Sequence, residues 1–466
     1  MNKEKERLAE YSARKKDWKL WGPYLAERQW GTVREDYSAD GDAWNYTTHD
    51  QSRSRTYRWG EEGIAGICDR KQMLCFSLAF WNGADPILKE TFFGVSGKQG
   101  NHGEDVKEYY YYLDNLPTHA YMKMLYKYPQ TEYPYKQLVE ESLKRSRQQG
   151  EYELLDTGIF SEDKYFDIFI EYAKNTPDDI LIKITAFNQS KTAADLHIIP
   201  QLWFRNTWAW GLDDYKPHLR RKSGDTIEIQ HEKLGKYYLY YESGKALFCE
   251  NETNRQRLYN DKNVTKVKDG LNDFIVNGVE DAVSDKNEGT KVGIDYKTRI
   301  SGKSYKSLRL RLTSTAHTDY LKDFEEIFNE RIRETEEFYG NIQRDLKDKD
   351  KRAVQRQAFA GMLWNKQYYN FDVSRWLAGD PSQPAPPDAR LKGRDSDWIH
   401  LNNEDVISMP DKWEYPWYAA WDLAFHCIPI AMIDSELAKK QLLLLTREWY
   451  MHPNGELPAY EWNFSD

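Results

Sequence analysis

The segment Ile180-Leu181-Ile182-Lys183-Ile184-Thr185-Ala186 carries the clearest structural signal in the chain. Its isoleucines recur at every second position, and a period of two is typical of a β-strand with one buried face. The same alternation occurs in the segments 227–229 and 308–312. Clusters of Gly, Asp, Asn and Ser separate these apolar runs. Residues 21–316 are therefore predicted to form an antiparallel β-sandwich, with one helix inserted near 135–149.

The hydrophobic period changes after residue 316. Leu321, Phe324, Ile327, Phe328 and Ile332 recur at helical spacing and predict a helical linker over 317–350. Three further helices are predicted at 354–369, 417–432 and 435–450, and residues 1–20 read as a short helix or a frayed end. The predicted fold class is therefore multidomain β plus α, with a sandwich, a helical linker and a helical domain at 351–466.

The composition excludes several classes of function. The net charge is −9 and the pI about 5.7, which argues against a nucleic-acid partner. No apolar run reaches the roughly 18–20 residues of a membrane span. The charged residues 1–16 contain no signal-peptide core, so a cytoplasmic protein is expected. The four cysteines lack metal or disulfide spacing, and we expect free thiols, no metal and no cofactor.

A dense aromatic cluster surrounds one carboxylate near the end of the chain. Trp413, Glu414, Trp417 and Trp421 precede or flank Asp422. A carboxyl group walled by indoles is partly desolvated, and desolvation raises its pKa. Such a group stays protonated near neutral pH and can act as a general acid. A buried aspartate that bridges helices among core tryptophans is the alternative.

Two further clusters contain the residue types that bind sugars. The loop 455–463 carries Glu461 and Trp462, and Gly and Pro predict a turn there. Trp364 and Tyr368 are predicted to lie on one helix, where an indole and a phenol could stack on a ring. An ordinary surface turn and ordinary core packing are the respective alternatives.

Other motifs give weak signals. The segment His102-Gly103-Glu104-Asp105, with Glu108, has metal-ligating residue types at a spacing that fits no metal geometry. The segment 94–98 lacks the spacing of a phosphate-binding loop. His426 follows Asp422 by one helical turn and could orient its carboxylate, although a core histidine is the simpler interpretation.

Four motifs together resemble glycoside hydrolase family 63, which includes the processing α-glucosidase and bacterial α-glycosidases. The acid-bearing motif of the family is similar to residues 413–426, Trp-Glu-Tyr-Pro-Trp-Tyr-Ala-Ala-Trp-Asp-Leu-Ala-Phe-His. Residues 21–37, 57–61 and 101–109 also resemble bacterial members. The resemblance extends over nearly the whole chain.

The resemblance implies a β-sandwich, a helical linker and an (α/α)6 barrel, of which residues 351–466 would form the first part. It implies inverting, exo-acting hydrolysis of α-glucosides or α-mannosides, with Asp422 as the general acid. Inversion needs a second carboxyl group about 6.5–9.5 Å away. The family's base is a later Glu, so we expect an incomplete chain with little activity of its own. The proposed pocket residues are Trp364, Tyr368, Trp413, Glu414, Trp417, Trp421, Glu461 and Trp462. The polar, Gly-rich character of the loops 61–62 and 102–108 predicts that they cover this pocket from the sandwich side.

Three alternatives remain open at this point. The chain could be a non-catalytic carbohydrate-binding protein, a phosphorylase on the same scaffold, or an incomplete gene product. A carbohydrate is the expected partner, with no nucleic acid and no membrane, and the sequence predicts no particular oligomeric state.

Overall fold

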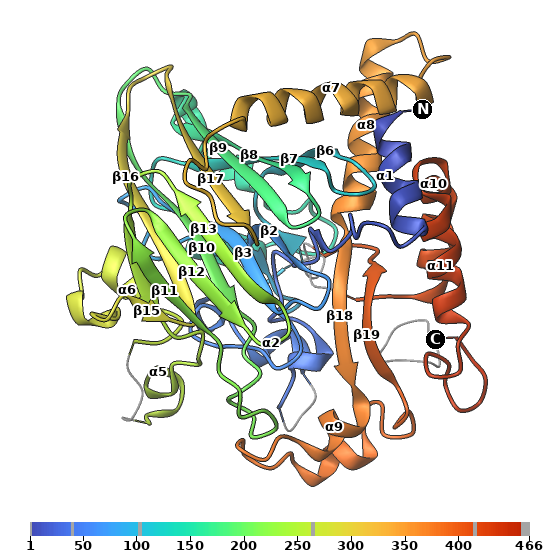
Figure 1. Cartoon of the computed structure of the whole chain (residues 1–466). Helices are drawn as coiled ribbons and strands as arrows, with labels where there is room; N and C mark the ends of the chain where they lie inside the picture. Colours follow the sequence, from blue (N-terminus) through green and yellow to red (C-terminus); the bar gives the residue numbers. More distant parts are fainter. Residues whose placement is uncertain (1, 39–41, 101–104, 262–265, 413–416, 458–466) are drawn as a thin grey trace.

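Two antiparallel sheets form the main body of the molecule (Figure 1). The computed structural model describes residues 2–38, 42–100, 105–261, 266–412 and 417–457. The first sheet has six strands in the order β1 (Trp21–Gly22), β2 (Ile64–Asp69), β3 (Leu74–Trp81), β10 (Ala194–Phe204), β16 (Lys291–Ile300) and β14 (Lys245–Cys249). The second has nine strands in the order β15 (Glu288–Gly289), β11 (His218–Ser223), β12 (Thr226–His231), β13 (Gly235–Tyr241), β17 (Tyr305–Thr313), β9 (Asp179–Asn188), β8 (Tyr165–Thr176), β7 (Tyr121–Pro129) and β6 (Tyr110–Asn115).

The alternating isoleucines lie on a strand and face the core, as their period of two predicts. Ile180, Ile182 and Ile184 on β9 pair with the leucines of β17 and are buried in the core. The two sheets meet face to face around this core, since Phe76 of β3 packs edge-on against Tyr172 of β8 at 6.2 Å between ring centroids. The Tyr172 hydroxyl also donates a hydrogen bond of 2.6 Å to the carbonyl of Ala65. A sandwich-like arrangement of the N-terminal part is therefore confirmed.

Short helices decorate the sandwich and longer ones follow it. The inserted helix α4 is shorter than the predicted range, and the predicted N-terminal helix is α1. The α-helices up to this point of the chain are α1 (Lys3–Ser12), α2 (Ala43–Tyr46), α3 (His49–Ser52), α4 (Tyr135–Lys144), α5 (Arg255–Tyr259) and α6 (Gly270–Ile275). Single 3-10 turns are η1 (Val33–Glu35), η2 (Leu154–Thr157), η3 (Ser161–Asp163), η4 (Glu280–Ala282) and η5 (Asp388–Lys392). A two-stranded ribbon joins β4 (Gly94–Val95) to β5 (Asp105–Val106).

The predicted helix at 354–369 is wrong in its last five residues, 365–369. The helix α7 (Phe324–Ile342) leads to α8 (Lys349–Trp364), and the chain then enters β18 (Lys366–Asp372). This strand pairs with β19 (Asn402–Ser408) over seven residue pairs. Aromatic residues favour strands when a partner is available, and here the partner lies more than thirty residues later, beyond the reach of periodicity. The segment after 351 is therefore not all helical.

The last helices lie beside the N-terminus. Following α9 (Val373–Ala378), the helices α10 (Ala420–Ile433) and α11 (Ser435–Leu445) pack along one side of the molecule with α1 and α8 (Figure 1). Compared with the predicted ranges, α10 starts three residues later and ends one residue later, whereas α11 starts as predicted and ends five residues earlier. An ion pair between Lys19 and Asp434 joins the N-terminal segment to the turn between α10 and α11.

Two general expectations can be checked in the described residues. All four cysteines are buried and free, as predicted. Every helix in the described part of the chain is too short or too polar to span a bilayer.

Candidate functional site

Asp422 lies in the first turn of α10 and is half-buried. Its Oδ2 atom is shielded from solvent and makes no hydrogen bond within the described part of the chain. Burial raises the pKa of the Asp422 carboxyl above its ordinary value. A partly desolvated carboxyl group with one oxygen unpartnered among the described residues is suited to hold a proton and donate it.

The predicted indole wall is only partly described. Trp421 is 58% exposed and lies edge-on to Phe425, at 6.4 Å between ring centroids. Trp417 is half-buried just before the helix begins. The predicted pocket residues Trp413, Glu414, Glu461 and Trp462 fall outside the described residues. Trp421 therefore lies on the outer side of α10, together with Phe425.

His426 has a partner other than Asp422. Its Nδ1 atom lies 3.2 Å from the Ser408 hydroxyl oxygen on β19. Burial lowers the pKa of His426, so the ring is neutral at neutral pH. This contact favours a structural role, in which His426 ties α10 to the β18–β19 ribbon.

Trp364 and Tyr368 are core residues rather than pocket residues. The Trp364 indole is fully buried, stacks on Tyr112 with centroids 5.2 Å apart, and donates to the Asp114 carbonyl at 3.1 Å. Tyr368 is 1% exposed and packs against Tyr24 and neighbouring apolar side chains. Neither ring presents a face to a ligand, because sandwich residues already cover both.

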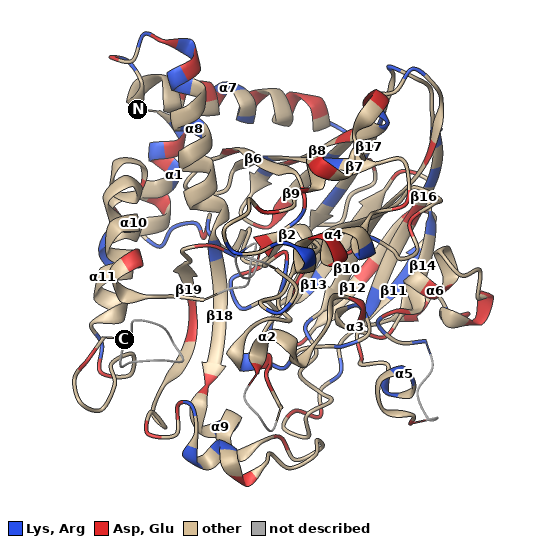
Figure 2. Cartoon of the chain, turned by 180° about the vertical axis from the view of Figure 1, so that it is seen from behind, with Lys and Arg blue, Asp and Glu red and all other residues tan. Residues whose placement is uncertain are grey.

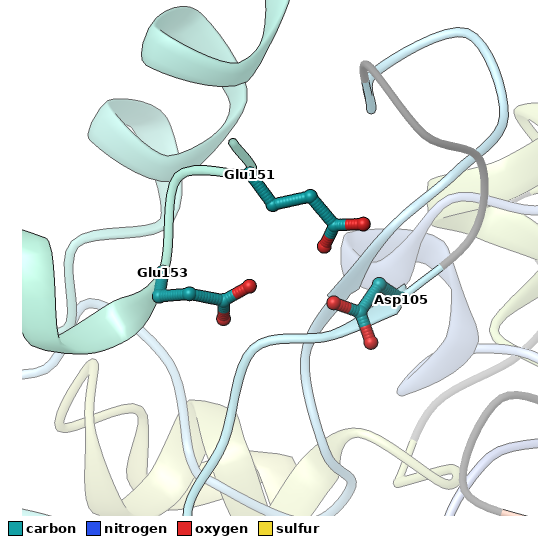
Figure 3. A group of neighbouring side chains, drawn as sticks. All are labelled: Asp105, Glu151 and Glu153. Atoms are coloured by element: carbon teal, nitrogen blue, oxygen red, sulfur yellow. The ribbon is translucent and has the colours of Figure 1, made fainter. Parts of the chain in front are cut away.

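The acidic segment around residue 105 surrounds a lysine. Figure 3 shows Asp105, Glu151 and Glu153 converging from two segments. The Lys107 ammonium lies among them and donates to the three carboxylates at 2.8, 3.1 and 3.1 Å. One ammonium group therefore compensates part of the charge of the three carboxylates and already occupies the space between them.

The loops 61–62 and 102–108 are predicted to cover the pocket. Residues 102–104 fall outside the described residues, and Glu61, Glu62 and Glu108 are buried. Glu108 accepts hydrogen bonds from Lys89 Nζ at 2.7 Å and from the Tyr126 hydroxyl at 2.9 Å. Glu61 accepts from Asn251 Nδ2 at 2.9 Å, and Glu62 from the Gln29 backbone N–H at 2.7 Å. These contacts give no support to a position over Asp422.

Sequence reasoning missed a buried polar segment in the loop after β1. Every residue from 21 to 36 is buried, including charged ones such as Glu27, Arg34 and Glu35. Arg34 stacks on the Tyr369 ring at 4.0 Å and donates to the Asn370 carbonyl at 3.2 Å. Charged residues without periodicity normally indicate a surface loop, so only the density of Trp and Gly around them could have signalled burial.

Glu35 is the most perturbed carboxylate of this segment. It is 1% exposed, and neither of its oxygens has a hydrogen-bond partner within the described residues. Burial raises its pKa to about 8, despite the opposing charge of Arg34. Burial also raises the pKa of the nearby Glu62 to about 7. Two carboxyl groups that titrate near neutral pH therefore lie below the surface on the sandwich side.

Two segments that carry the family resemblance meet in space. Lys412, fully buried, donates hydrogen bonds to the carbonyls of Pro23 and Leu25 at 2.9 and 2.6 Å. This lysine directly precedes the aromatic motif that ends at Asp422. The loop after β1 therefore holds the residue that precedes that motif in the sequence.

Comparison with known proteins gives a relative without a described activity. No family model matches the chain. The chain is 44% identical to the uncharacterized protein YMR196W of Saccharomyces cerevisiae, across 99% of this chain and 47% of that protein. The chain thus spans about half the length of this curated relative.

Similar solved structures are distant. A human-microbiome protein provisionally assigned as a kojibiose phosphorylase aligns at 10% identity and a TM-score of 0.28, covering 84% of this chain and 44% of its own. A 4-α-glucanotransferase from Thermococcus litoralis aligns at 8% identity and a TM-score of 0.20, covering 58% and 30%. TM-scores this low support neither a shared fold nor a shared activity, so the functional argument rests on the residues of this chain.

Proposed function

We propose that the chain is the N-terminal part of an inverting, exo-acting α-glycoside hydrolase in which Asp422 is the general acid. One observation carries the proposal. The Asp422 carboxyl is half-buried, has no partner for Oδ2 among the described residues and has a raised pKa. The resemblance of residues 413–426 to an acid-bearing motif supports the same role.

The proposed reaction needs a second carboxylate. Asp422 gives its proton to the glycosidic oxygen while the bond from that oxygen to the anomeric carbon breaks. A water molecule attacks the opposite face of that carbon and loses its proton to a base. We place the base in polypeptide that the longer relative has and this chain does not span, as part of an (α/α)6 barrel that begins within residues 351–466.

The exposed apolar side chains on the outer face of α10 favour the presence of further helices that pack against it in the longer protein. Figure 2 shows that this helix carries almost no Lys, Arg, Asp or Glu. Its outward side chains recur at helical spacing and are large, apolar and exposed: Trp421 58%, Phe425 65%, Ile428 67% and Met432 58%. Monomeric proteins rarely leave such a stripe open to water. We assign it to packing against the polypeptide that completes the barrel.

The product anomer tests the proposed reaction. The longest open reading frame that contains these residues should be expressed and assayed by NMR on α-glucosides and α-mannosides. We expect the β-anomer of the released sugar to form first. Release of the α-anomer, release only in the presence of phosphate, or no release at all would each overturn the inverting hydrolase. Sugar binding without release would favour a non-catalytic carbohydrate-binding protein.

The apolar stripe gives a prediction that depends on chain length. Ile428→Lys should change the stability of the 466-residue chain by less than about 0.5 kcal/mol, because the side chain is exposed there. In the longest chain the same variant should destabilise by about 2–5 kcal/mol, because a charge would be buried between helices. Thermal unfolding measures both effects.

The matched control is Leu143→Lys on α4, where the leucine is 59% exposed on the sandwich side. It should be neutral in both chains. Equal effects of Ile428→Lys in the two chains would remove the support for helices that pack on α10.

A further inference from the structure

A cleft of about 380 Å³ lies on the sandwich, apart from the Asp422 motif. Its lining comes from five segments: the loop after β1, the region of α2 and α3, the loop after β3, the region of β4, and the start of α4. Figure 2 shows α2, α3 and α4 near one another on the face turned to the viewer. Small-molecule sites are typically clefts of about 300–1,000 Å³ formed where several segments converge.

The walls of the cleft are aromatic. His49 lies at their centre, with ring centroids 5.4 Å from Trp30, 5.1 Å from Phe93 and 5.4 Å from Tyr135. Burial, together with the charges of Lys89 and Arg28, lowers the pKa of His49 well below its ordinary value. The histidine is therefore neutral at neutral pH and can both donate and accept a hydrogen bond. Trp30 and Phe93 are buried behind the wall, so the half-buried rings of Trp44, His49 and Tyr135 are the ones that a ligand could contact.

A buried hydroxyl in the lining has no partner. Thr47 is 1% exposed, and its Oγ1 makes no hydrogen bond within the described part of the chain. Buried polar atoms are nearly always satisfied by protein, water or ligand. Thr47 belongs to the lining of the cleft, and we assign the missing partner of its hydroxyl to a group bound there. Asn45, Thr48 and Gln99 add further neutral amide and hydroxyl groups to the lining.

The charged groups that line the cleft already have protein partners. The Arg28 guanidinium stacks on the Trp30 ring at 4.2 Å. Asp50 forms ion pairs with Arg53 and Arg257. The cleft therefore favours a neutral ligand that has an apolar face and a rim of hydroxyl groups.

We propose that this cleft binds a neutral pyranose ring. The inference rests on the carbohydrate substrate of the proposed function, and it places a sugar on the sandwich rather than at Asp422. A pyranose offers C–H faces for the aromatic walls and hydroxyl groups for Thr47 and the amides. Thr47 is the residue whose buried hydroxyl gains its partner on binding.

Saccharide binding to the 466-residue chain tests the site. Methyl α-D-glucopyranoside, methyl α-D-mannopyranoside and maltose are titrated by calorimetry and ligand-observed NMR. Thr47→Val should weaken binding roughly 2- to 10-fold, because one hydrogen bond to the sugar is lost. Its melting temperature should stay the same or rise, because a buried unpartnered hydroxyl is removed.

A second variant blocks the cleft without touching the core. Pro86 lines the cleft and is exposed, and Pro86→Trp should reduce binding at least tenfold with unchanged folding. Thr185→Val is the matched control, because the Thr185 hydroxyl pairs with Ser307 on the sandwich sheet, outside the cleft lining. It should leave binding unchanged.

Two results would overturn the proposal: no binding of any of the three saccharides, or binding that Thr47→Val and Pro86→Trp leave unaltered. The hydrolase is judged separately, by sugar release from the longest chain. Sugar release by the longest chain, without saccharide binding in the cleft, would support the proposed hydrolase and reject this binding site. Cleft binding without sugar release would keep the site and reject the hydrolase.

Discussion

Asp422→Asn is expected to lower kcat of the longest chain by about 10²–10⁴-fold on an unactivated α-glycoside, with ground-state binding little changed. Asparagine has nearly the same shape but holds no acidic proton, so the leaving oxygen departs as an alkoxide. A substrate such as a glycosyl fluoride, whose leaving group needs no proton, should lose less than about tenfold. The kcat of the unaltered enzyme should fall as the pH rises through the pKa of the Asp422 carboxyl, which burial raises.

Comparing the loss of kcat on the two substrates distinguishes a catalytic role of Asp422 from a purely structural one. Asp397→Asn is the matched control, because the Asp397 side chain is 73% exposed on the same part of the chain. Equal losses of Asp422→Asn on both substrates, or a lowered melting temperature, would assign Asp422 to helix packing. Unchanged sugar affinity without any turnover to lose would identify a binding protein.

Glu35→Gln is expected to stabilise the protein in a pH-dependent way. The folded state holds the Glu35 proton up to about pH 8, whereas the unfolded chain releases it near 4.5. The folded state therefore binds more protons between these values, and its stability falls as the pH rises across this window. Glutamine stays neutral throughout, so the variant should gain about 2–4 kcal/mol over the wild type at pH 8.5 and little at pH 4.5.

Urea unfolding at several pH values measures the difference in unfolding free energy between Glu35→Gln and the wild type. Glu337→Gln provides the comparison, because Glu337 is exposed on α7. A gap that does not change with pH would show that Glu35 is already ionised and paired in the folded state. The stability of the protein also falls with rising pH because of Glu62, whose pKa is raised to about 7. Glu35→Gln removes only the contribution of Glu35, so the difference between variant and wild type reports on Glu35 alone.

The sequence predicts the sandwich well because its signal is local. The alternation at 180–186 depends only on which face of the strand is buried, and β9 and β17 pair accordingly. The strand at 366–372 was missed because its stability comes from β19, a partner that no short window contains.

The candidate site is predicted less completely for a related reason. A tryptophan suits a core as well as a sugar platform, and only the contact with Tyr112 assigns Trp364 to the core. The sequence contains no pattern that marks Thr47 as a candidate binding residue, because a single threonine is noticed only when the cleft that it lines is known. Asp422 could be selected as a candidate because its aromatic neighbours stand next to it in the sequence.

The lysine anchors described above have a consequence for the order of folding. Lys412 reaches the carbonyls of Pro23 and Leu25, and Lys19 reaches Asp434, so both partnerships join residues about four hundred positions apart. A ribosome releases the loop after β1 long before it adds Lys412, and domains generally fold from the N-terminus as they emerge. The hydrogen bonds of those carbonyls with Lys412 can therefore form only late in synthesis. Contacts between residues so far apart in the sequence are also slow to form.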